Sequence, residues 1–174
     1  MIITWAGYAC FKIEGSSATV ATDPFSPKVG MKLPKISAEI IISTKNDDYH
    51  GNISGITSKG PESKVLRGAG EYEVKDILMY GTQMFKENGT DKEGNTACIY
   101  RIQMDGMNLV HLGALSFALK NSQLDHLDKT DILFIPVGGG RYLHGKESAE
   151  LVNQIEPRIV IPMCYKIGGT KDSI

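Results

Sequence analysis

The segment that most constrains the fold is Ile40–Asn52, in which three isoleucines are followed directly by the mostly polar run STKNDDYHGN. A short run of β-branched apolar residues is typical of a buried strand. The abrupt change to hydrogen-bonding side chains indicates that this strand emerges from a sheet into a loop. We therefore expect a sheet in which one buried strand ends in a loop of polar, hydrogen-bonding side chains.

The rest of the chain is rich in strands, with helices late in each half. The pattern indicates two sheets packed face to face with helices outside, an α+β class, in a single domain over residues 1–174. Residues 86–95 (KENGTDKEGN) are expected to form an exposed hairpin or loop, and Asp105-Gly106 a tight hairpin turn. The predicted helices are Asn121–Leu127 and Lys146–Ile155, and the predicted strands are Ile2–Trp5, Ala9–Ile13, Ala18–Thr22, Ile40–Ile42, Val65–Leu66, Glu71–Val74, Ile77–Met84, Ala97–Met104, Met107–His111, Ile132–Pro136 and Ile159–Met163.

Composition and charge exclude several classes of protein. The chain has 174 residues, of which 41% are hydrophobic, and its formal net charge is -1. This size suits one domain with a substantial core. The interspersed charges provide no basic surface for nucleic acid or anionic lipid, and no apolar run approaches the ~20 residues of a membrane-spanning helix. We expect neither a nucleic-acid partner nor membrane association.

The cysteines and the N-terminus predict a cytoplasmic location. Cys10, Cys98 and Cys164 are few, odd in number and widely spaced, and each lies in or beside an apolar run. This pattern favours buried, reduced thiols over a disulfide framework. The first residues, MIITWAGYACF, lack the basic region and the cleavage site of a signal peptide.

Six segments, in order, resemble the ascorbate-phosphate-lactonase-like branch of the metallo-β-lactamase superfamily. The resemblance implies a four-layer αβ/βα sandwich, here short at the C-terminus, with a metal site along the edge where the two sheets meet. The segments are Met1–Phe11, Ala21–Phe25 (ATDPF), Gly68–Val74 (GAGEYEV), Val110–Leu115 (VHLGAL), Asp131–Gly140 (DILFIPVGGG) and Pro157–Tyr165 (PRIVIPMCY).

The same resemblance locates the expected metal ligands, most of which are replaced. The three histidines of the family's Ser/Thr-His-x-His-x-Asp-His motif fall on Thr44, Asn46 and Tyr49, while the motif aspartate is kept as Asp48. No histidine occurs in Gln83–Lys86, where another is expected. The aspartate that usually bridges two metals is Ala114 and the final histidine is Cys164. Threonine, asparagine and tyrosine are poor substitutes for neutral imidazole in a zinc site.

Two functional hypotheses follow from this degenerate metal site. The first is a pseudoenzyme: a hydrolase-like protein that needs no cofactor and serves as a binding or scaffold protein for a small-molecule or protein ligand. The alternative is a metal-dependent hydrolase of a small lactone or phosphoester with a rebuilt zinc site. Its weak catalytic candidates are Asp48, His50 and Cys164, and a shift of one residue would make Asp47, His50 and Cys164 the ligand set.

The pseudoenzyme hypothesis predicts a hydrogen-bonded cluster in place of the ions. Thr44, Asn46, Asp48 and Tyr49 should converge there with Cys164 and Ala114, because buried polar groups without a cation need partners. Asp48 is expected to accept hydrogen bonds from loop amides, and Cys164 to be an inert thiol.

The other histidines and the chain end complete the expectations. His111, within an apolar run, should be a satisfied buried histidine, whereas His126 and His144 should lie at the surface. The resembling proteins continue beyond this point with a helix and usually a strand. An uncovered outer surface would be apolar, and contacts between copies in a homo-oligomer commonly cover such surfaces.

Overall fold

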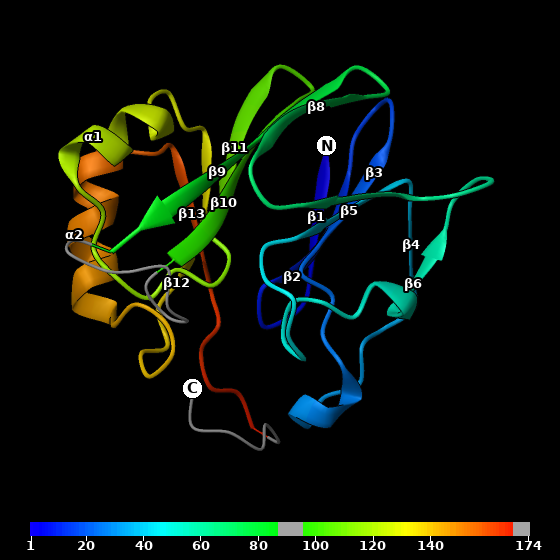
Figure 1. Cartoon of the computed structure of the whole chain (residues 1–174), viewed down its shortest axis with the longest axis horizontal. Coiled ribbons are helices and arrows are strands. Elements are labelled where there is room, and N and C mark those ends of the chain that lie inside the picture. The colour runs from blue at the N-terminus through cyan, green and yellow to red at the C-terminus, as the bar shows by residue number, and fades with distance from the viewer. Residues whose placement is uncertain (87–95, 169–174) are drawn as a thin grey trace.

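A computed structural model describes residues 1–86 and 96–168 and contains two facing sheets (Figure 1). The first sheet has the order β1-β2-β3-β5-β7, and the second has the order β13-β12-β11-β10-β9-β8. Strands of the first sheet are β1 (Ile2–Gly7), β2 (Cys10–Glu14), β3 (Thr19–Thr22), β5 (Ile40–Ser43) and β7 (Lys64–Arg67). Strands of the second are β8 (Gly70–Val74), β9 (Ile77–Phe85), β10 (Thr96–Met104), β11 (Met107–His111), β12 (Ile132–Pro136) and β13 (Ile159–Met163).

The main core lies between the inner faces of the two sheets. Side chains of a strand alternate between its two faces, and β10 shows this plainly. Its residues Cys98, Tyr100 and Ile102 join the inter-sheet core with Phe11 of β2, whereas Ile99 faces the helical layer. The helices α1 (Asn121–Leu124) and α2 (Gly145–Ile155) cover the outer face of the second sheet (Figure 1). The fold class is therefore confirmed as an α+β sandwich.

The outer layer of the first sheet differs from the sequence prediction. Of the described residues, those covering this face form short 3₁₀ turns, η1 (Pro27–Val29) and η2 (Ile53–Gly55), and a small parallel sheet of β4 (Ile36–Ala38) and β6 (Ile56–Ser58). These elements contribute Val29, Ile36 and Ile56 to an apolar cluster against the sheet. Three-residue strands lack the length of periodic pattern that sequence reasoning needs, so neither was predicted.

Most predicted elements are present with small shifts at their ends. Strands β11, β12 and β13 have the predicted bounds. Asp105 and Gly106 take positive φ values of 51° and 74°, as a tight hairpin between β10 and β11 requires. The predicted helix Asn121–Leu127 is one α-helical turn continued by the 3₁₀ turn η3 (Asp125–Leu127).

The remaining expectations concern the surface. Strand β13 forms an edge of the second sheet, and its Ile159 and Val160 are 48% and 39% exposed. The segment expected to be a hairpin or loop at residues 86–95 lies outside the described residues, apart from Lys86. No helix in the described parts of the chain is long and apolar enough to cross a membrane.

Candidate functional site

Loops from both sheets meet where several parallel strands end. Strands β3 and β5 run parallel in the first sheet, and β11, β12 and β13 run parallel in the second. Carboxyl ends of parallel strands lie at one edge of their sheet. This arrangement places Asp23, the loop after β5, Gly113-Ala114, the turn after β12 and Cys164 in the same region.

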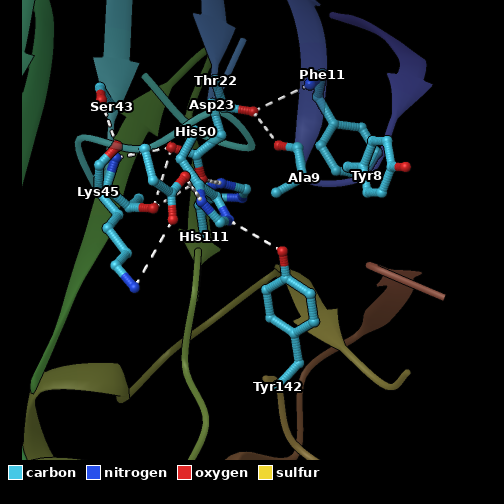
Figure 2. A network of polar contacts seen from close by, with 12 residues as sticks. Tyr8, Ala9, Phe11, Thr22, Asp23, Ser43, Lys45, His50, His111 and Tyr142 are labelled. Atoms are coloured by element: carbon cyan, nitrogen blue, oxygen red, sulfur yellow. Dashed lines mark hydrogen bonds and ion pairs between the residues drawn. The ribbon is translucent and has the colours of Figure 1, made fainter. Parts of the chain in front are cut away.

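Asp23 is the centre of the buried polar network in this region (Figure 2). Its carboxylate accepts hydrogen bonds from the Thr44 backbone N–H at 2.7 Å and from the Thr44 hydroxyl at 2.8 and 3.0 Å. The Nε2 atom of His111 lies 2.8 Å from the same carboxylate. Asp23 joins the end of β3 to the ends of β5 and β11, and so links the two sheets.

The backbone around Asp23 explains why an aspartate suits this position. Strand β3 ends there because Pro24 cannot continue a sheet ladder. Asp23 has φ of +39°, a left-handed conformation that aspartate and asparagine tolerate better than other residues. The Thr22 hydroxyl, just before it, bonds the Ala9 carbonyl at 2.9 Å and so fixes the strand end to β2.

His111 is buried, as the sequence predicted, with 0% exposure. A carboxylate can only accept hydrogen bonds, so His111 donates from Nε2 to Asp23. Its Nδ1 atom has no hydrogen-bond partner among the described residues, so the prediction that His111 would be fully hydrogen-bonded was wrong for this nitrogen. The imidazole is therefore held by one strong hydrogen bond and by edge contacts with the neighbouring rings of Phe11 and Phe134.

The Thr44 side chain fits closely against the loop that follows β11. A Cβ atom at Gly113, which has φ of +53°, would lie 2.4 Å from the Thr44 hydroxyl oxygen. Only glycine allows this approach. Ala114, the next residue, packs against the inter-sheet core to which Cys164 also belongs. The structure thus brings Thr44, Ala114 and Cys164 into one region, as predicted.

A second group of contacts organises the loop after β5. The Asp47 carboxylate lies 2.7 Å from Nδ1 of His50 and accepts the Tyr49 backbone N–H at 2.9 Å. Burial alone would raise the pKa of Asp47, but the hydrogen bond from His50, with the charge of Lys45, outweighs burial and lowers it. Among the side-chain hydrogen bonds of this loop, the Tyr49 amide is accepted by Asp47, whereas Asp48 was expected to accept loop amides.

Tyr142 connects this loop to the end of β13. Its hydroxyl lies 3.4 Å from Nε2 of the buried His50 (Figure 2), and its ring belongs to the same buried cluster as Cys164. Burial raises the pKa of both Tyr142 and Cys164 well above their ordinary values. Cys164 has 0% exposure, which agrees with the predicted inert thiol.

Tyr49 is buried, but it takes part in the site through its ring. The guanidinium of Arg141 stacks over that ring, with Cζ 4.2 Å from the centroid. Tyr8 packs edge-on against the same ring at 5.3 Å and accepts the Cys164 backbone N–H at 3.2 Å through its carbonyl. Tyr49 and Cys164 therefore both adjoin Tyr8.

Asn46 and Asp48 differ from the prediction because both are exposed and lie outside the buried cluster. The Asp48 carboxylate is 3.7 Å from the Lys28 ammonium group, and both side chains are largely exposed. Asn46, Asp47 and Asp48 line an open hollow of about 580 Å³ on this side of the loop, together with Ser26, Lys28, Gly51 and Asn52. His126 and His144 are exposed, as expected.

Sequence reasoning missed three residues of this site: Asp23, Arg141 and Tyr142. Aspartate before proline at a strand end was a usable signal for Asp23, since such residues mark the ends of sheet ladders. No local pattern identifies Arg141 or Tyr142. They follow the run Gly138–Gly140, where Gly139 and Gly140 have φ of +74° and +62° and allow the chain to turn back.

Comparison with known proteins identifies the family. The model of the β-lactamase superfamily domain matches residues 2–164, nearly all of the chain. The chain belongs to the metallo-β-lactamase superfamily. This assignment agrees with the two facing sheets and with the loops that meet at their edge.

Sequence relatives within the superfamily are named metal-dependent hydrolases. A UPF0173 metal-dependent hydrolase of Methanosarcina mazei is 27% identical over 190 residues, covering 94% of this chain and 82% of the relative. One from Carboxydothermus hydrogenoformans is 23% identical over 192 residues, covering 95% and 84%.

Solved structures share the same fold. A Thermotoga maritima protein, described as a candidate Zn-dependent hydrolase of the superfamily, has a TM-score of 0.76 and 26% identity, with 95% of this chain and 76% of that chain covered. A Parabacteroides distasonis protein has a TM-score of 0.72 at 18% identity, with 97% and 83% covered.

These names raise the question of whether the superfamily's metal would fit the residues present here. The Thr44 hydroxyl is engaged by Asp23, and the Tyr49 ring lies under a cationic guanidinium. Ala114 offers no donor, Asn46 and Asp48 are exposed, and the Cys164 thiol contacts Tyr142. No group of three or more His, Cys, Asp or Glu side chains in residues 1–86 and 96–168 could hold a metal ion. As arranged, these side chains do not fit a divalent metal.

Proposed function

We propose that this protein is a metal-free, non-catalytic member of the metallo-β-lactamase superfamily that acts as a binding or scaffold protein. The observation that carries the proposal is the use made of the former ligand positions. The Thr44 hydroxyl is taken up by a hydrogen bond to Asp23, Tyr49 by a cation–π contact, and Cys164 is fully buried in the core. Hydrolysis in a metal-dependent enzyme relies on the ion to generate hydroxide and polarise the scissile group.

The hollow beside the loop after β5 is the proposed place for a ligand. Its walls carry the carboxylates of Asp47 and Asp48, the amides of Asn46 and Asn52, and the ammonium group of Lys28. These groups offer both donors and acceptors, with two carboxylates and one ammonium group among them. A polar ligand, either a small molecule or a protein side-chain cluster, suits such a surface better than an apolar one, and the cytoplasm is the expected location.

The alternative, a hydrolase with a rebuilt site, would require Asp48, His50 and Cys164 to act together. Asp48 is 51% exposed and paired with Lys28, whereas His50 is 1% exposed. Cys164 is fully buried, and its raised pKa keeps the thiol protonated, although a nucleophile or ligand must be a thiolate. Asp48 is thus exposed while His50 and Cys164 are buried, and this difference favours the non-catalytic proposal.

The test combines metal content with turnover. Protein purified without a metal-affinity tag is analysed for bound metals, then assayed on lactone and phosphodiester substrates with and without Mn²⁺ or Zn²⁺. We expect substoichiometric metal and no metal-responsive rate. The Methanosarcina mazei relative, purified in parallel, shows whether the procedure itself strips metal. Metal-stimulated turnover that Asp48→Ala abolishes would instead establish the hydrolase.

A further inference from the structure

We propose that Tyr142 takes over the linking role of a metal ion, joining the loop after β5 to the second sheet through a chain of hydrogen bonds from Asp47 to His50 and Tyr142. The inference rests on the proposed metal-free function and adds what replaces the ion. A metal bound by residues of both segments would cross-link them, and without it another contact must hold them together.

The first part of the chain fixes the state of His50. The Asp47 carboxylate, 2.7 Å from Nδ1, can only accept a hydrogen bond, so that nitrogen carries the proton. In the neutral ring, Nε2 is then an acceptor. It faces the Tyr142 hydroxyl at 3.4 Å, the long end of the hydrogen-bonding range, within a buried environment (Figure 2).

The second part of the chain is the hydrogen bond that the protonated Tyr142 hydroxyl donates. Tyr142 and Cys164 are 2% and 0% exposed, so both are held in their neutral, protonated forms. The Tyr142 hydroxyl donates to Nε2 of His50, and the Cys164 thiol is buried in the same cluster as Tyr142. The His50 ring and the Tyr142 hydroxyl then each have a partner, and no cation is needed to balance these buried atoms.

The turn that carries Tyr142 is anchored on both sides. The Tyr142 backbone N–H bonds the Gly139 carbonyl at 3.0 Å, and the Leu143 N–H bonds the Leu115 carbonyl at 3.1 Å. The Val137 N–H bonds the Met163 carbonyl at 3.0 Å, directly beside Cys164. Tyr142 is therefore positioned by a turn that backbone hydrogen bonds hold in place. Arg141, in the same turn, stacks over the Tyr49 ring.

A double-mutant cycle tests the chain. Tyr142→Phe removes only the hydroxyl, and His50→Ala removes the ring that accepts its hydrogen bond. We expect each variant to raise the unfolding equilibrium constant by about 5-fold or more, with non-additive effects, since hydrogen-bonded neighbours couple. Tyr80→Phe on β9 is the matched control, because no hydrogen bond to its hydroxyl is found among the described residues, and it should change stability less than 2-fold.

The nitrogen NMR spectrum of His50 gives a readout that packing alone would not move. We expect the wild-type ring to carry its proton on Nδ1 and a hydrogen-bonded Nε2, and Tyr142→Phe to shift the Nε2 resonance while Nδ1 stays protonated. If Tyr142→Phe does not fold, the wild-type spectrum decides by itself. A proton on Nε2 would overturn the chain.

Metal addition separates this inference from the proposed function. Co²⁺ should give no thiolate charge-transfer band with the wild-type protein, and neither Zn²⁺ nor a chelator should move its melting temperature. A cobalt–thiolate band shows that metal joins the segments and refutes the inference. Additive effects in the cycle, without metal or turnover, overturn the chain alone. Turnover in a protein that retains the coupling overturns the non-catalytic function alone.

Discussion

Replacing Asp23 by asparagine should destabilise this protein more than any other isosteric change in the described site. The carboxylate accepts bonds from the Thr44 N–H, the Thr44 hydroxyl and His111 Nε2 at full burial. An amide oxygen can still serve the Thr44 N–H, but its NH₂ group then faces the remaining donors. Asparagine also tolerates the φ of +39°, so backbone strain adds little.

The expected loss is about two charge-assisted hydrogen bonds, or roughly 3 to 5 kcal/mol. A typical domain has only about 5 to 15 kcal/mol of unfolding free energy, so Asp23→Asn should approach the limit of folding. At this chain length the melting temperature should fall by about 10 °C.

Urea unfolding and thermal melting should be compared between Asp23→Asn and Asp48→Asn, which make the same chemical change at a buried and at an exposed position. Asp48 is exposed, and its ion pair with Lys28 spans 3.7 Å, so Asp48→Asn should change the free energy of unfolding by less than about 0.5 kcal/mol. An Asp23→Asn variant within about 1 kcal/mol of wild type would refute the view that this carboxylate ties the two sheets together.

Three further predictions concern the backbone, pH and the thiols. Gly113→Ala should lower the free energy of unfolding in urea by about 2 kcal/mol or more, because its φ is +53° and the new Cβ would lie 2.4 Å from the Thr44 hydroxyl oxygen. Gly106→Ala is the control, because its φ is +74° but no atom lies near the new Cβ, so it measures the cost of the backbone conformation alone. Equal losses in the two variants would argue against a steric clash with Thr44. Burial alone would raise the pKa of Glu39, but a backbone hydrogen bond and the charges of two lysines lower it. The ionised Glu39 carboxylate therefore stabilises the fold above its unfolded pKa, near 4.3, and this stabilisation is lost as pH falls through the lower pKa of the folded state. Glu39→Gln should therefore flatten acid unfolding below about pH 4.3, and an unchanged profile would contradict this. Burial raises the pKa of all three cysteine thiols, one of them to about 11, so a thiol reagent should label the native protein at pH 8 far more slowly than the unfolded protein.

The elements that could be predicted from the sequence are those with a strong local signal. Strands β12 and β13 are continuous apolar runs that each follow a charged residue, and β11 begins after the Asp105-Gly106 turn. The predicted ends of all three agree with the structure. The three-residue strands β4 and β6 were missed, because each depends on the other, 20 residues away in sequence, for its pairing.

The candidate site was only partly predictable. The loop after β5 was recognised, and Thr44, Ala114 and Cys164 come together as expected. Asn46 and Asp48 were assigned to the buried cluster, but the loop leaves them exposed. Loop side chains have no fixed alternation of facing, so spacing alone could not decide which of them is buried.

By itself, the sequence determined the family-like order of strands and the loss of most imidazole and carboxylate donors, because both are properties of local residue identity. Only the tertiary structure decided what occupies their place. Asp23 lies 21 residues from Thr44 and 88 from His111, and Tyr142 lies 92 residues from His50. Such pairings depend on how two sheets and a glycine turn bring distant segments together, and no local pattern of hydrophobicity or charge encodes that approach.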